Sequence, residues 1–255
     1  MIGQRLRPSL ICLLAVALLL CGGLVARPAE AVDMSSAWAD LKQLEKSMGR
    51  KNTNEDLLQY LDAVTDLSLR LLHAFCLGLG LPGKFLDSEF DGNHTGFVRL
   101  NYYPVDDPLR DAAIPHMPTA DMGVHHHTDA GALTVLLQDD IGGLQVHHDN
   151  QWHEVPPIDG AFVINTGDMM QVWSNDKYQS PVHRVLPMHS TDRYSLPFFF
   201  NPSAATKVSP LASLLSPDNP AGYRTIEWAE FRGKRTDGDY ADYGTEVQIG
   251  QYRLP

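Results

Sequence analysis

The spacing of apolar residues predicts one long helix in the first third of the chain. Between residues 54 and 78 the apolar side chains recur at helical spacing, which gives the helix one apolar face. Glycine and proline at residues 78, 80 and 82 end this pattern. A shorter helix is expected over residues 35–48. We expect the long helix to pack against a partner, and its sequence suggests no chemistry.

After Gly96 the pattern changes to short β-like runs separated by Gly, Pro, Asn and Asp. Eight such runs at close spacing, without helices between them, predict an antiparallel sandwich or barrel such as a jelly roll. A helix around residues 225–232 is expected to cover one face. The predicted fold class is therefore mainly β with flanking helices. The predicted strands are residues 97–103, 124–129, 133–138, 144–148, 162–165, 169–173, 182–185 and 194–200.

A hydrophobic leader precedes these elements. Arg5 and Arg7 stand before a mostly apolar run that small residues follow, a pattern typical of a signal peptide. We interpret residues 1–31 as a signal peptide or membrane-targeting leader. The alternatives are a retained membrane anchor and a gene-model artefact whose true start is Met34. A real leader predicts a secretory or organelle location, and a start at Met34 predicts a cytoplasmic one.

The rest of the chain is divided by composition into three parts. These are a helical N-terminal segment (residues 32–95), a β domain (residues 96–205), and a C-terminal helix and tail that pack on the same domain (residues 206–255). With 44% hydrophobic and 20% charged residues the composition is that of a globular protein. The net charge of -11 offers no cationic surface to phosphates, which excludes a dedicated nucleic-acid binder. A membrane partner is expected only if the leader is retained, and the oligomeric state is left open.

A candidate metal site centres on His127 and Asp129. They stand two residues apart in a predicted strand, so their side chains are expected on one face, which His125 shares and His126 does not. His127 is preferred because it alone stands two residues before an acid, and His183 in another β-like run is the best-placed third ligand. Two histidines and one carboxylate form the facial triad that suits Fe(II) and leaves positions open for catalysis. The chain has 11 histidines, so a chance His-x-Asp is the alternative.

A candidate anion site begins ten residues after His183. In the strand predicted there, Arg193, Ser195, Pro197 and Phe199 share one face. A guanidinium buried in a small barrel needs an anion, and its planar fork fits a carboxylate. A dicarboxylic keto acid would serve both sites, with one end on the metal and the other on Arg193. This geometry predicts 2-oxoglutarate.

Two more residues are candidates for the same ligand. Asn101 and Tyr103 share one face of another predicted strand and could add hydrogen bonds to the keto acid. The alternative is that Tyr103 and Pro104 only end that strand. The residues alone leave both explanations open.

Together these motifs resemble the plant-type 2-oxoglutarate/Fe(II) dioxygenases, the superfamily that includes isopenicillin N synthase and the gibberellin and flavonoid oxygenases. The order and the spacing of the motifs match as well as their residues. The matching segments are residues 101–104 (NYYP), 127–134 (HTDAGALT), 142–146 (GGLQV), 165–168 (NTGD), 180–185 (SPVHRV) and 193–195 (RYS).

The resemblance implies a double-stranded β-helix from about residue 54 to the C-terminus. It implies Fe(II), 2-oxoglutarate and O2 as the reacting cofactors, ascorbate as an optional reductant, and a small organic molecule that is hydroxylated with release of succinate and CO2. It also places Leu144 and Val146 near the metal pocket. The residues that it implies are His127, Asp129 and His183 for the metal, Arg193, Ser195, Asn101 and Tyr103 for 2-oxoglutarate, and Phe199 for the substrate.

Two features depart from the family. Its members normally begin with a further N-terminal region that contributes strands and a substrate-side wall, and most of them have no leader. Other functions therefore stay open at this point: a 2-oxoglutarate-independent iron oxidase of the same superfamily, or a catalytically silent barrel that binds a carboxylate or a partner. A zinc hydrolase with the same triad is a lesser alternative, because it would not need Arg193.

Overall fold

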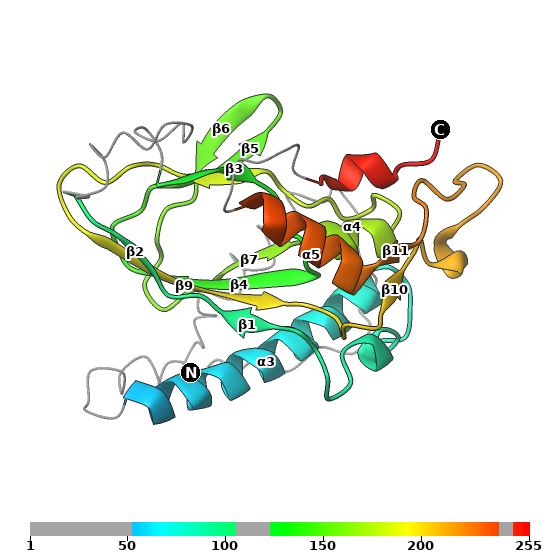
Figure 1. The fold of residues 1–255 in the computed structure, drawn as a ribbon, viewed down its shortest axis with the longest axis horizontal. Helices are drawn as coiled ribbons and strands as arrows, with labels where there is room; N and C mark the ends of the chain where they lie inside the picture. Colours follow the sequence, from blue (N-terminus) through cyan, green and yellow to red (C-terminus); the bar gives the residue numbers. More distant parts are fainter. Residues whose placement is uncertain (1–52, 106–122, 240–246) are drawn as a thin grey trace, which may run out of the picture.

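The computed structural model describes residues 53–105, 123–239 and 247–255, and Figure 1 shows strands at the centre of the molecule with helices around them. The helices are α3 Thr53–Gly78, α4 Asp168–Trp173 and α5 Trp228–Asp239, with short 3-10 helices at η1 Asp87–Glu89, η2 Ala212–Leu214 and η3 Ile249–Tyr252. The strands are β1 Phe97–Val98, β2 Asn101–Tyr103, β3 Val124–His127, β4 Leu133–Gln138, β5 Leu144–His148, β6 Gln151–Glu154, β7 Val163–Thr166, β8 His183–Val185, β9 Arg193–Phe200, β10 Lys207–Val208 and β11 Ile226–Glu227.

Two antiparallel sheets face each other within the described part of the chain. The larger runs β1-β9-β4-β7, with β2 also paired to β9, and the smaller runs β3-β8-β5-β6. From β3 to β9 the chain passes back and forth between these sheets, with β5 and β6 as the consecutive pair that stays in one of them. This is the strand order of a jelly roll, and the predicted mainly β fold with flanking helices is confirmed.

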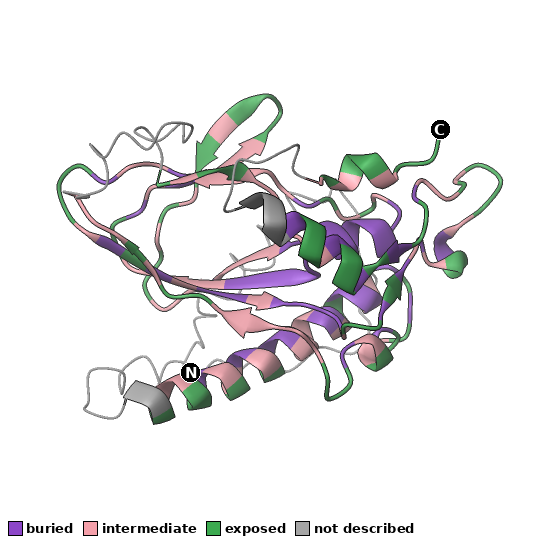
Figure 2. Ribbon diagram, in the orientation of Figure 1, coloured by how far each residue is buried: buried purple, intermediate pink, exposed green. Residues whose placement is uncertain are grey.

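The long helix α3 packs on the outer side of the larger sheet, against β4 and β9 (Figure 1). Tyr60, Val64 and Leu67 are buried at helical spacing and belong to the same hydrophobic cluster as Phe198 of β9 and Phe231 of α5. Figure 2 shows buried residues gathered where α3, β4 and α4 meet. The helix predicted from residue 54 is therefore present, and its buried face supports the wall that carries the site.

The structure corrects the predicted elements in several places. Residues 169–173 form part of α4 and not a strand, and because all of them are buried their apolar pattern could not distinguish the two. The strand β6 was missed because its residues, Gln151–Glu154, are mostly exposed and polar. The helix predicted around residues 225–232 begins only at Trp228, since Ile226–Glu227 pair with β10.

Several predictions concern residues outside the described ranges, namely the leader at residues 1–31, the alternative start at Met34 and the helix at residues 35–48. Within the described ranges, no helix combines the length and the apolar character needed to cross a bilayer.

Candidate metal centre and anion site

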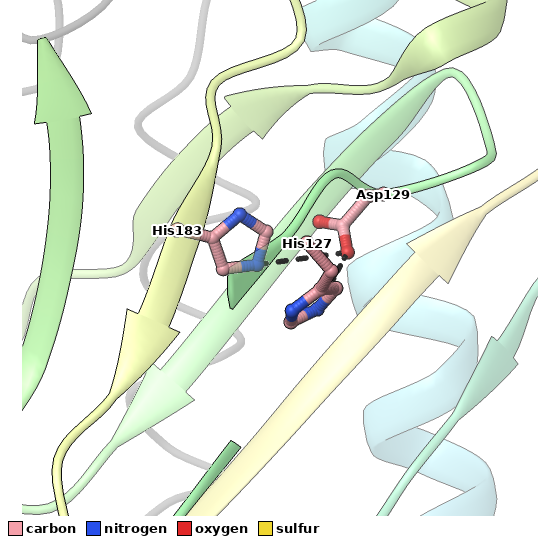
Figure 3. Close-up of side chains that lie close together, drawn as sticks. All are labelled: His127, Asp129 and His183. Carbon is pink, nitrogen blue, oxygen red and sulfur yellow. Dashed lines mark ion pairs between the residues drawn. The ribbon is translucent and has the colours of Figure 1, made fainter. Parts of the chain in front are cut away.

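Figure 3 shows the side chains of His127, Asp129 and His183 converging on one point. Strand pairing brings them together, because His127 at the end of β3 lies directly opposite His183 at the start of β8. Oδ1 of Asp129 lies 3.8 Å from Nε2 of His127 and 3.7 Å from Nε2 of His183. One ligand atom from each residue lies within 4.8 Å of the other two, so a single metal ion can contact all three.

The ligands are not arranged as simple strand alternation predicts. β3 ends at His127, so Asp129 belongs to the following loop. Between Val124 and His127 the pairing with β8 shifts register, which is a β-bulge. Val124 and His127 therefore both line the pocket, while His125 and His126 are both exposed. The expectation that His125 shares the face of His127 is wrong for this reason.

Each of the two histidines is oriented by a backbone carbonyl. Nδ1 of His127 lies 2.8 Å from the carbonyl oxygen of His125, and Nδ1 of His183 lies 3.1 Å from that of Pro181. Because a carbonyl oxygen only accepts, Nδ1 is the donor in both rings and Nε2 keeps its lone pair for a metal. Burial lowers the pKa of His127, and the adjacent His183 lowers that pKa further, which favours the neutral ligand form.

The carboxylate of Asp129 is buried and held by two donors. Its Oδ2 accepts hydrogen bonds from Oγ1 of Thr134 at 2.6 Å and from Nδ2 of Asn165 at 2.8 Å, which leaves Oδ1 for the metal. Burial alone would raise the pKa of Asp129, but His183, His127 and the two hydrogen bonds together hold it below its ordinary value. Thr134 and Asn165 stand in the segments that match the family, but the sequence assigned no role to either. They lie directly opposite each other on β4 and β7, which brings both donors to the same carboxylate oxygen.

A second layer of contacts fixes the loop between the ligands. The guanidinium of Arg235 on α5 donates through Nη2 to the carbonyl oxygen of Thr128 at 2.8 Å. Its Nη1 lies 3.4 Å from Oδ2 of Asp168, and both side chains are buried. The backbone N–H of Asp168 in turn donates to the carbonyl oxygen of Asp129 at 2.8 Å. No motif pointed to Arg235, because 107 positions separate it from Thr128.

The candidate anion site contains a fully buried arginine with only neutral partners among the described residues. Nη2 of Arg193 donates to Oε1 of Gln138 at 3.0 Å, and Nη1 lies 3.4 Å from Oγ of Ser195. Its Nε is buried without a hydrogen-bond partner. The guanidinium carbon lies 4.9 Å from the ring centre of Tyr103, and Nδ2 of Asn101 lies 3.4 Å from Oγ of Ser195. A buried cation with an unused donor favours an anionic ligand.

The metal group and the anion site share one pocket between the two sheets. All the residues expected at the site line this pocket, and Gln138 was missed because a polar residue at a strand end carries no distinctive pattern. Between the polar groups the wall is largely apolar, with Val124, Leu136, Leu144, Val146, Val155, Val163, Ile164, Pro181, Val185, Pro197 and Phe199.

The sequence is similar to parts of longer known proteins. Residues 94–202 match the family model of the 2OG-Fe(II) oxygenase superfamily. A 1-aminocyclopropane-1-carboxylate oxidase homolog from Solanum lycopersicum is 42% identical over 173 residues, which are 67% of this chain and 45% of the relative. Protein DMR6-LIKE OXYGENASE 2 from Arabidopsis thaliana is 39% identical over 197 residues, 76% of this chain and 53% of the relative. The chain thus spans about half the length of the curated relatives that it matches.

The structure also superimposes on solved structures of oxygenases. The crystal structure of JOX2 in complex with 2OG, Fe and JA superimposes with a TM-score of 0.68 at 31% identity, over 80% of this chain and 57% of that one. The dioxygenase for auxin oxidation in rice superimposes with a TM-score of 0.63 over 98% of this chain and 87% of that one. Its identity is 22%, so that likeness concerns the fold alone.

Proposed function

The chain belongs to the 2OG-Fe(II) oxygenase superfamily, and from this we propose that it is an Fe(II)- and 2-oxoglutarate-dependent dioxygenase that oxidises a small organic molecule. Hydroxylation is the default outcome, with 2-oxoglutarate converted to succinate and CO2. We assign the activity to the β domain at residues 96–205, with residues 32–95 and 206–255 as segments that support it.

The observation that carries the proposal is that one pocket combines a three-ligand group with a buried arginine whose partners among the described residues are all neutral. Two imidazole nitrogens and one carboxylate oxygen fit Fe(II), because this donor set leaves coordination positions open. Bound Fe(II) would supply the oxidising chemistry, with 2-oxoglutarate and O2 as its reactants. His127, Asp129 and His183 would hold the ion.

The residues around Arg193 fit a carboxylate. Its planar fork and unpaired Nε offer donors to the distal carboxylate of 2-oxoglutarate, and the hydroxyl of Ser195 offers another. Asn101 orients that hydroxyl, while the ring of Tyr103 covers the guanidinium. The apolar wall, which includes Phe199, would hold the substrate and exclude water from the reacting centre.

The test is to measure O2 uptake and succinate formation with and without 2-oxoglutarate. We expect both to depend on 2-oxoglutarate, and to be lost in His183→Ala and Asp129→Ala but kept in His153→Ala, whose exposed side chain lies outside the pocket. Uptake of O2 without 2-oxoglutarate would support the oxidase alternative. Absence of both signals, together with unchanged iron content in the two ligand variants, would support the silent barrel.

A further inference from the structure

The buried guanidinium of Arg193 is held by a glutamine that has no role in the proposed chemistry. Gln138 ends β4 and pairs directly opposite Ser195 of β9, so its side chain lies on the same face as those of Ser195 and Arg193. Nη2 of Arg193 donates to Oε1 of Gln138 at 3.0 Å. A guanidinium has donors only, so the amide must turn its oxygen toward it. Gln138 therefore orients the cation through a hydrogen bond.

The neutrality of this partner distinguishes Arg193 from Arg235, the other buried arginine in the described part of the chain. Arg235 forms an ion pair with Asp168, in which Nη1 and Oδ2 are 3.4 Å apart. The partners of Arg193 among the described residues are the amide of Gln138 and the hydroxyl of Ser195. Since neither group carries a charge, the positive charge of Arg193 is left uncompensated in the empty pocket.

The acids next to this pair in the sequence are bound to other donors. Asp192 directly precedes Arg193, but its Oδ2 accepts a hydrogen bond from the hydroxyl of Tyr102 at 2.8 Å. Asp139 directly follows the glutamine, and its Oδ2 accepts a hydrogen bond from the backbone N–H of Tyr194. Both carboxylates are therefore engaged outside the pocket, and neither forms an ion pair with the guanidinium.

We propose that Gln138 makes this site selective for an anion, because it orients Arg193 without neutralising it and leaves the ligand to supply the counter-charge. A buried cation without a counter-charge is unfavourable, and a bound carboxylate removes this cost. Gln138→Glu would instead supply the counter-charge from within the protein. The inference rests on the proposed function, because it takes the bound anion to be the distal carboxylate of 2-oxoglutarate. Gln138 is thus a positioning residue that acts through Arg193.

The test compares 2-oxoglutarate with 2-oxopentanoate, which has the same chain length and chelating end but no distal carboxylate. Each is titrated anaerobically into the Fe(II)-loaded protein, and the visible charge-transfer band gives its affinity. We expect the wild type to bind 2-oxoglutarate about 10- to 100-fold more tightly, as for a charge-assisted hydrogen bond. Gln138→Glu should bring this ratio close to one by weakening 2-oxoglutarate alone. Gln138→Met removes the acceptor without adding a charge, so it should keep part of the ratio.

Gln145→Glu is the matched control. Oε1 of Gln145 accepts a hydrogen bond from Nε of Arg184 at 2.9 Å, so this variant also places an acid beside an arginine, but neither residue lines the pocket. It should leave the ratio unchanged. A wild-type ratio near one, a ratio that Gln138→Glu leaves unchanged, or equal weakening of both keto acids by Gln138→Glu would overturn the inference.

A measurement without metal separates the inference from the proposed function, which fails if the wild type forms no band. Urea unfolding of the metal-free protein is followed with and without excess glutarate, a dicarboxylate that lacks the keto group. We expect Gln138→Glu to unfold at a higher urea concentration than the wild type, because its acid pairs with Arg193. Glutarate should raise the midpoint of the wild type alone. If glutarate raises both midpoints alike, or neither, the inference is wrong whether or not the band forms.

Discussion

The two oxygens of Asp129 have different tasks. Oδ2 takes the hydrogen bonds of Thr134 and Asn165, while Oδ1 points to Nε2 of both histidines. A carboxylate fixed in this way cannot rotate without breaking two bonds, so it presents one oxygen to a metal. Thr134 and Asn165 should therefore affect the affinity for the metal, although neither of them touches it.

Thr134→Val tests this division of tasks, because it removes one donor with little change in shape. We expect the affinity for Fe(II) to fall by about 10- to 100-fold, as when other supporting partners are removed. Thr65→Val is the matched control, since that hydroxyl bonds to the carbonyl oxygen of Leu61 within α3. Affinity is measured by anaerobic competition with a chelator, and equal affinities for the two variants would refute the role of Thr134.

Gly167 is required by close packing under the ligand loop. A Cβ at this position would lie 2.3 Å from the carbonyl oxygen of Gly131 and 2.8 Å from that of Asp129, both rigid backbone atoms. Gly167→Ala should therefore destabilise the protein by about 1–3 kcal/mol and displace the loop. Gly233→Ala in α5, where a Cβ meets nothing within 4 Å, should stabilise the helix by about 0.5–1 kcal/mol. Urea unfolding compares the two, and a neutral Gly167→Ala would contradict this explanation.

At the level of elements, α5 connects the C-terminal part of the chain to the metal ligands. Arg235 contacts Thr128 between the ligands and pairs with Asp168 at the start of α4. Arg235→Met leaves the buried Asp168 unpaired, and we expect a loss of about 3–5 kcal/mol in the free energy of unfolding together with weaker Fe(II) binding. The double variant Arg235→Met/Asp168→Leu should recover most of the stability without recovering metal affinity. If both variants bind Fe(II) like the wild type, α5 does not position the loop.

Asp168 makes the free energy of unfolding depend on pH. The pKa of Asp168 is raised from its ordinary value of 3.8 to about 6, because burial raises this pKa more than the nearby Arg235 lowers it. The folded protein therefore holds the carboxyl proton of Asp168 more tightly than the unfolded chain does. The resulting contribution to the free energy of unfolding is complete below about pH 4 and is lost as the pH rises through about 6. Relative to Asp168→Asn, the unfolding free energy of the metal-free wild type should fall by about 3 kcal/mol across this range. A difference between the two proteins that does not vary with pH would contradict the shifted pKa.

The sequence predicts elements well where the pattern is local. The bounds of β4 and β5 agree with the predicted strands because both segments lie between turn residues: Leu133–Gln138 is mostly apolar, and Leu144–His148 begins with alternating apolar and polar residues. The bulge in β3 could not be predicted, since the register shift depends on its pairing with β8. The role of Arg235 was hidden for a related reason, because only the packed fold brings α5 to the ligand loop.

At the scale of the whole molecule, the jelly roll explains why the site residues are far apart in sequence. The chain passes between the two sheets, so the two candidate histidine ligands come from β3 and β8 of one sheet, and the residues proposed to bind 2-oxoglutarate come from β2 and β9 of the other. Asp129 comes from the loop that follows β3. The two groups meet only because the sheets face each other. Their order and spacing could be recognised from the sequence, whereas their common pocket is a property of the fold.

The central claim is that one pocket holds Fe(II) and 2-oxoglutarate together, and an anaerobic titration of the Fe(II)-loaded protein with 2-oxoglutarate tests it most directly. The visible charge-transfer band of the chelate reports both ligands at once. We predict a saturable band in the wild type, none in Asp129→Ala, and one in Arg193→Gln that needs about 10- to 100-fold more 2-oxoglutarate. A wild type without the band, or an Asp129→Ala variant with the wild-type band, would contradict the claim.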